Sequence, residues 1–273
     1  MKRICAVALL LAGVLLAAAV FGEGAPGTPV RAIAPGVEYA TFPFGGASGV
    51  LYVVRVDPAR ATLAFGLASE HEGKARTAGE WRRDLGFAVA INAGMYATDG
   101  RTNVGCLRDG AHANNARWSA DYKSALAFGP KKKGIPAAAM FDLDGARRPA
   151  ALADYGSVVQ NLRLLKRAGR NVWSRQDRRW SEAAVGMDDR GRVLLMFCRA
   201  PLSMWEFNEA LRRLPLGVVQ AMHVEGGPEA SLSIHAGKVD LDLSGSYETG
   251  FNENDAQRRQ WPIPNVIGVR AAP

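Results

Sequence analysis

The chain has 273 residues, of which 48% are hydrophobic, 22% charged and 8% aromatic. This balance is that of a globular protein, and it excludes a disordered chain, a coiled coil and a collagen-like fibre. Lys and Arg outnumber Asp and Glu by 34 to 26, which gives a net charge of +8. A basic protein attracts anionic partners, but the basic residues are dispersed without interleaved aromatic residues, so we expect no nucleic-acid partner.

The first residues have the pattern of a secretory signal peptide. Lys2 and Arg3 precede an apolar run over residues 4–20, with alanines at positions 17, 18 and 19. The alternative is an uncleaved membrane anchor, but the run is slightly shorter than the roughly 20 residues that a membrane span prefers. We therefore predict a signal peptide at residues 1–22, no membrane span after its cleavage, and a periplasmic or extracellular location.

Three cysteines exclude a small scaffold stapled by disulfides. Cys5 lies in the predicted signal peptide. Cys106 and Cys198 could pair in an export compartment, but each lies in a strand-like run, where a buried free thiol is common. We expect two free thiols. Because the two cysteines have no CxxC spacing, they do not indicate a zinc site, and we expect neither a metal nor a cofactor.

Residues 23–48 are rich in Gly, Pro and Ala and are expected to be a flexible lead-in. The remaining residues, 49–273, have the length of a single domain. Strand-like runs over 50–56 and 61–67 predict a hairpin. Thr77 and Glu80 have the spacing of a capping box, which predicts a short helix towards Leu85. A buried-looking strand over 87–91 then ends at Asn92.

A second strand-rich block covers residues 157–165, 183–188 and 192–198. Ser203 and Glu206 form another capping box, followed by apolar residues at helical spacing. A strand over 217–224 leads to Glu225, a hairpin follows around Gly237, and a strand over 266–269 closes the chain. Most connections are too short for parallel crossovers. We therefore predict an α+β fold, a single domain with a mixed, largely antiparallel β-sheet core flanked by a few helices.

Two strand ends carry polar residues that could form a site, whereas the GxxxxGK[ST], GxSxG and HExxH motifs are missing from the sequence. Asn92 follows one apolar strand and is backed by Gly94, which lets the backbone approach a ligand. Glu225 follows another strand, with two glycines behind it and Glu229 four residues further on. Two carboxylates can act as acid, base or nucleophile at a glycosidic bond. The alternatives are a plain turn at Asn92 and exposed turn glutamates.

At these residues the sequence resembles the phosphodiester glycosidases, and in particular their exported bacterial relatives. The resemblance covers about residues 52–270 and rests on five segments in the family's order. These are residues 91–96 (INAGMY), 159–161 (VQN), 184–193 (AVGMDDRGRV), the helix from Ser203 with the loop from Glu225, and 261–267 (WPIPNVI). Two segments depart from the better-known members: their Arg-Thr before Ala-Val-Gly is Glu182-Ala183 here, and their Asp-Gly-Gly-Gly-Ser loop is EGGPE.

The resemblance implies an exported hydrolase that cleaves the glycosidic bond of a sugar 1-phosphodiester, its ligand being a small sugar phosphate or an envelope glycan. Glu225 would be the catalytic carboxylate that faces the anomeric carbon, with Glu229 as a second one. An arginine would offset the phosphate charge, because its planar fork can bind two oxygens. The expected substrate-binding residues are Asn92, Gly94, Tyr96, Asn161, Gly226 and Gly227, together with one of Arg101, Arg163 and Arg199.

Two other functions stay open. The altered residues also fit a catalytically inactive exported domain that binds glycans, and an enzyme that hydrolyses another envelope phosphodiester. An enzyme would gather Asn92, Asn161 and Glu225 around one cavity, with the carboxylate within reach of solvent. A binding domain would show aromatic platforms and no inward carboxylate.

Overall fold

The computed structural model describes residues 27–46, 49–145 and 148–271. The predicted signal peptide and the first residues of the expected lead-in lie outside this part of the chain. Within it, no helix is both long and apolar enough to cross a membrane.

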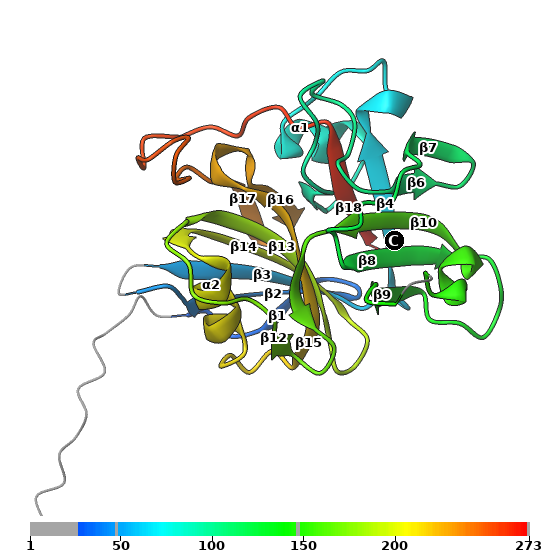
Figure 1. Ribbon diagram of the computed structural model, residues 1–273, viewed down its shortest axis with the longest axis horizontal. Coiled ribbons are helices and arrows are strands. Elements are labelled where there is room, and N and C mark those ends of the chain that lie inside the picture. Colours follow the sequence, from blue (N-terminus) through cyan, green and yellow to red (C-terminus); the bar gives the residue numbers. More distant parts are fainter. Residues whose placement is uncertain (1–26, 47–48, 146–147, 272–273) are drawn as a thin grey trace, which may run out of the picture.

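Three antiparallel sheets form the molecule (Figure 1). The largest has the strand order β1-β2-β3-β14-β13-β15-β11-β12. Its strands are β1 (Arg31–Ala34), β2 (Val37–Pro43), β3 (Val50–Val56), β11 (Arg163–Lys166), β12 (Arg170–Asn171), β13 (Trp180–Asp188), β14 (Val193–Leu202) and β15 (Val218–Gly226).

The other two sheets have five strands each, in the orders β7-β6-β10-β8-β9 and β17-β16-β5-β18-β4. The first contains β6 (Leu107–Asp109), β7 (His112–Asn115), β8 (Ser124–Pro130), β9 (Ala138–Asp142) and β10 (Tyr155–Asn161). The second contains β4 (Ala61–Leu67), β5 (Val89–Asn92), β16 (Ser231–Ala236), β17 (Val239–Ser244) and β18 (Asn265–Ala271). The predicted α+β class is confirmed.

One hydrophobic core joins the three sheets, because Leu195, Val159 and Ile267 come from different sheets and belong to the same buried cluster. The helices α1 (Ala78–Asp84) and α2 (Met204–Leu211) cover outer faces. Trp81 packs from α1 into one satellite cluster, and Phe207 packs from α2 into another. The helices therefore complete a β-built core rather than form it.

Both helices begin at the predicted capping boxes. The Thr77 hydroxyl accepts from the Glu80 N–H at 3.2 Å, and the Glu80 carboxylate accepts from the Thr77 N–H at 2.8 Å. Ser203 and Glu206 repeat this pair of bonds at 3.3 and 3.0 Å. Each box satisfies N–H groups that the first helical turn leaves without a partner.

The structure corrects two sequence-based expectations about the strands and divides a third predicted segment between two sheets. The hairpin of residues 50–56 with 61–67 is wrong, because β3 is paired on both sides, with β2 and β14, and β4 pairs with β18 in another sheet. Residues 31–43, placed in the lead-in, form β1 and β2, and Val37 and Tyr39 are buried in the core. Residues 157–165 divide between β10 and β11, which belong to different sheets.

Cys106 and Cys198 are both free and buried, as expected. Burial raises the pKa of the Cys198 thiol to about 12, and it also raises the pKa of the Cys106 thiol. Neither thiol is therefore a thiolate at neutral pH, and the thiolate is the reactive form.

We expect Ellman's reagent at pH 8 to label neither thiol in the folded chain and both in the denatured chain. The measurement uses a Cys5→Ser variant, so that only Cys106 and Cys198 are counted. If the chain is denatured without a reductant and no thiol reacts, the two cysteines are joined by a disulfide and the free state is contradicted.

Candidate active site

The side chain of Asn92 joins two segments that are far apart in the sequence. Asn92 is the last residue of β5 and is buried. Its Nδ2 donates to the carbonyl oxygen of Glu229 at 3.0 Å, and its Oδ1 accepts from the backbone N–H of Ser231 at 2.7 Å. The Asn92 turn and the bend that contains Glu229 therefore lie together, as the proposed site requires.

A second amide, that of Asn161, holds the turn after β5. Its Nδ2 donates to the carbonyl oxygen of Ala93 at 2.8 Å. A Cβ atom on Gly94 would lie 2.4 Å from Oδ1 of both Asn103 and Asn161, so only glycine fits this close approach. Both side chains are buried. Asn92 bonds to backbone groups through both amide atoms and Asn161 through its Nδ2, so they position the site and do not line its cavity.

A cavity of about 320 Å³ opens beside Glu225. This volume lies at the lower end of the range of about 300–1,000 Å³ that ligand sites occupy. Its polar lining comes from Gln176, Arg178, His223, Glu225, Gly226 and Glu248, and its aromatic lining from Trp173 and Trp180. The predicted Glu225 and Gly226 thus belong to one cavity, together with residues that the sequence analysis did not single out.

Glu225 occupies an environment that favours its uncharged form. Burial raises the pKa of this carboxyl to about 8, although His223 and the Gly226 N–H, 3.1 Å from Oε1, stabilise the carboxylate. The negative charges of Glu229 and Glu248 add to the rise. Glu225 is therefore mostly protonated at pH 7.

Glu229 and Tyr96 lie close to this carboxyl. Burial raises the pKa of Glu229, and the charge of Glu248 adds to the rise. Burial also raises the pKa of Tyr96, with further contributions from Glu229 and Glu225. The predicted residues Tyr96, Glu225 and Glu229 therefore form one electrostatic cluster, although Glu229 and Tyr96 do not line the cavity itself.

Glu248 brings a further carboxylate to the cavity from the segment between β17 and β18. Its Oε2 lies so close to Gly227 that a Cβ atom there would be only 2.4 Å away. Gly227 also has a φ of +59°, a conformation that favours glycine. The predicted Gly227 thus makes room for Glu248. No motif in the sequence marks Glu248, because its place depends on how this long segment folds back.

Glu182 and His223 form a buried pair beside Glu225. Nδ1 of His223 lies 2.7 Å from Oε1 of Glu182, and Nε1 of Trp180 donates to Oε2 of Glu182 at 2.7 Å. Burial alone would lower the pKa of His223, but the charge and hydrogen bond of Glu182 raise it, with help from Glu225 and Glu248. A charged residue inside an apolar strand, as at Glu182, was the signal that could have revealed this pair.

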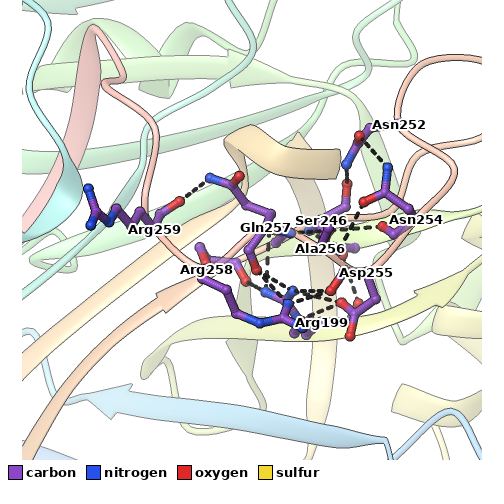
Figure 2. Close-up of polar contacts among 12 residues, drawn as sticks. Arg199, Ser246, Asn252, Asn254, Asp255, Ala256, Gln257, Arg258 and Arg259 are labelled. Carbon is purple, nitrogen blue, oxygen red and sulfur yellow. Dashed lines mark hydrogen bonds and ion pairs between the residues drawn. The ribbon is translucent and has the colours of Figure 1, made fainter.

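The three predicted arginines point elsewhere. Arg163 bonds to Asp144 at 2.8 Å and to Asp142 at 3.5 Å. Arg199 donates to the Asp255 carboxylate at 2.7 Å and to the carbonyl oxygens of Ser244 and Gln257 at 2.5 and 2.6 Å. Figure 2 shows the Arg199 side chain enclosed by the segment that carries Asp255 and Gln257. Arg101 is exposed and lies beside Gly73.

None of these three arginines lines the cavity, whereas Arg178 does. Within the described ranges, no three His, Cys, Asp or Glu side chains are grouped as a metal site would need.

Comparison with known proteins gives a family and a fold. A family model described as phosphodiester glycosidase matches residues 86–270. No curated protein matches the chain in sequence. A hypothetical protein from Synechocystis has a similar solved structure, with a TM-score of 0.59 and 16% identity; the alignment covers 87% of this chain and 62% of that one.

The catalytic domain of zebrafish N-acetylglucosamine-1-phosphodiester alpha-N-acetylglucosaminidase, described as auto-inhibited by its pro-peptide, has a TM-score of 0.58 and 12% identity. The alignment covers 90% of this chain and 87% of that domain. At these identities the two structures show a shared fold.

We expect the Glu225→Gln variant to melt at a higher temperature than the parent chain at pH 8, and at the same temperature at pH 4.5. The unfolded carboxyl ionises near 4.5 and the folded one near 8, so the folded state loses stability as the pH rises between these values. Glutamine has no carboxyl to ionise, so the variant does not lose this stability. The expected gain at pH 8, measured by calorimetry, is about 2–4 °C for each kcal/mol of stability that is regained.

Glu209→Gln is the matched control. The hydrogen bond from Asn171 lowers the pKa of Glu209, so its replacement should lower the melting temperature at pH 8. An unchanged or lower melting temperature for Glu225→Gln at pH 8 would contradict the proposed environment of Glu225.

Proposed function

The chain belongs to the phosphodiester glycosidase family, and we propose that it is an exported hydrolase that cleaves the bond between the anomeric carbon of a sugar and a phosphodiester oxygen. The observation that carries this proposal is the environment of Glu225, a carboxyl in a cavity with its pKa raised to about 8. Strongly shifted carboxyl groups in cavities are typical of catalytic sites.

A neutral Glu225 solves an electrostatic problem of this substrate. The phosphodiester is an anion, and an ionised carboxylate beside it would repel it. A protonated carboxyl instead donates a hydrogen bond to the phosphodiester oxygen. As the bond from the anomeric carbon to this oxygen breaks, Glu225 passes its proton to the departing phosphomonoester. That leaving group is a weak base, so the main gain comes from the hydrogen bond and the absent repulsion.

Glu248 lines the same cavity and is the second carboxylate of the proposal. It would stabilise positive charge that develops at the anomeric carbon and accept the proton of the attacking water. Water then supplies the new hydroxyl of the sugar. Glu229, whose charge acts on both Tyr96 and Glu225, would support this role from behind the cavity wall.

One observation also fits a domain that only binds glycans. Trp173 and Trp180 line the cavity, and aromatic faces commonly stack on sugar rings. Such stacking would orient a sugar in the enzyme as well. The inward-facing Glu225 favours the enzyme, because a binding site has no need for a carboxyl held in a desolvated cavity.

We expect Glu225→Gln to lower kcat/KM on a chromogenic sugar 1-phosphodiester by about 10²- to 10⁴-fold, the usual contribution of a positioned acid. Glu225→Asp should retain part of the activity. The Glu209→Gln variant, altered on α2, should keep full activity. Near-normal turnover by a folded Glu225→Gln variant would remove Glu225 from the mechanism.

The rate should depend on pH in a defined direction. We expect kcat/KM to fall as the pH rises through about 8, because the protonated form of Glu225 is the active one. Steady-state kinetics between pH 5 and pH 10 would measure this limb, which should be missing from the residual activity of Glu225→Gln. A rate that rises through pH 8 would show that Glu225 acts as a base.

A further inference from the structure

A phosphodiester needs positive charge where it binds, and the acidic side of the cavity supplies none. Glu225 and Glu248 line the cavity, and the charge of Glu229 acts on Glu225. Arg163 and Arg199 are bound to carboxylates elsewhere. The basic side chains that line the cavity are those of Arg178 and His223, and Glu182 raises the pKa of His223.

His223 is held in one orientation with one nitrogen left for a ligand. Its Nδ1 is bonded to Glu182, whose other oxygen is bonded to Trp180, so the ring cannot rotate without breaking this chain. Its Nε2 has no hydrogen-bond partner in the part of the chain that the structure describes, and this atom is accessible to solvent. A protonated imidazole donates from both nitrogens, and in this form Nε2 offers an N–H to the cavity.

The guanidinium of Arg178 is available for a ligand, and the backbone next to Arg178 is held in place. Its side chain is exposed and forms no ion pair within the described ranges, whereas the neighbouring Arg179 pairs with Glu206 at 2.6 Å. The Arg179 N–H donates to the Thr249 hydroxyl, and the Arg179 carbonyl oxygen accepts from the Thr249 N–H, both at 3.0 Å. This anchors Arg178 beside the segment that brings Glu248 to the cavity.

We propose that Arg178 and His223 form the phosphate-binding pair of this cavity, an inference that rests on the proposed function for its substrate and deepens it. The ligand class is a phosphate ester of a sugar. The Arg178 fork would bind two phosphate oxygens, and Nε2 of His223 would donate to an oxygen nearer Glu225. The titratable groups that face His223 are Glu182 from β13, Glu225 from its own strand β15, and Glu248 from the segment after β17.

The test measures phosphate binding directly. Titration calorimetry with inorganic phosphate and with a sugar 1-phosphate is carried out on the full chain and on Arg178→Ala. We expect a loss of affinity of about 10- to 100-fold for both ligands, the usual effect of losing a charged hydrogen bond. Arg178→Lys should recover part of the affinity. Arg175→Ala is the matched control, because the Arg175 guanidinium stacks over the Trp205 ring, 4.1 Å from its centroid.

His223 is tested without a substitution, since removing it would leave buried Glu182 without its partner. Nitrogen-15 NMR of the histidine side chains should show the Nε2 signal of His223 moving on addition of inorganic phosphate. Equal phosphate affinity in Arg178→Ala and Arg175→Ala, or a His223 signal that phosphate does not move, would overturn the pair. Phosphate binding without hydrolysis of any sugar 1-phosphodiester would instead leave the pair standing and overturn the proposed function.

Discussion

The buried amide of Asn92 is the contact on which the site depends. It satisfies a carbonyl oxygen of Glu229 and an N–H of Ser231, which lie 137 and 139 residues further along the chain. An amide offers a donor and an acceptor on two separate atoms of one short side chain. An aliphatic residue would leave both backbone groups unsatisfied, at about 1–3 kcal/mol each. The acidic bend after β15 is therefore held against the turn after β5 by two specific hydrogen bonds.

The second constraint is the number of charges that can be buried in one place. Glu182 and His223 are buried and Glu225 is half-buried. The three lie within a few residues of one another on β13 and β15, where full ionisation of both carboxylates would be costly. Pairing with His223 compensates Glu182, and protonation removes the charge of Glu225. The arrangement that makes the burial of Glu182 and His223 tolerable also places the neutral acid Glu225 and the oriented ring of His223 at one cavity, which suits the anionic substrate proposed above.

Local features could be read from the sequence. The two capping boxes depend on residues three apart, so the starts of α1 and α2 were predictable, and apolar alternation located most strands. Strand partners were not predictable in the same way. β3 and β4 are consecutive strands, yet they do not pair with each other. Both edges of β3 are occupied, by β2 and β14, and β4 pairs with β18 in another sheet.

The same distinction between local features and strand pairing applies to the candidate site. Glu225 and Gly226 follow an apolar strand and were identified by position, and Asn92 was placed correctly beside their loop. His223 and Glu182 were missed because they meet across β13 and β15, whose register shifts between Ala183 and Ala184. The three arginines were proposed because a guanidinium can bind phosphate oxygens, but which way a strand arginine points depends on strand pairing. Arg163 consequently pairs with acids on and after β9.

The central claim is that the bond broken is the one at the anomeric carbon, and hydrolysis in ¹⁸O-labelled water tests it most directly. Phosphorus NMR of the phosphomonoester released from a sugar 1-phosphodiester reports whether the phosphate has gained the label. We predict an unlabelled phosphomonoester, because water attacks carbon and the phosphate keeps its own oxygen. A phosphomonoester that carries ¹⁸O would show that phosphorus is attacked, and the chain would then be a phosphodiesterase of another kind.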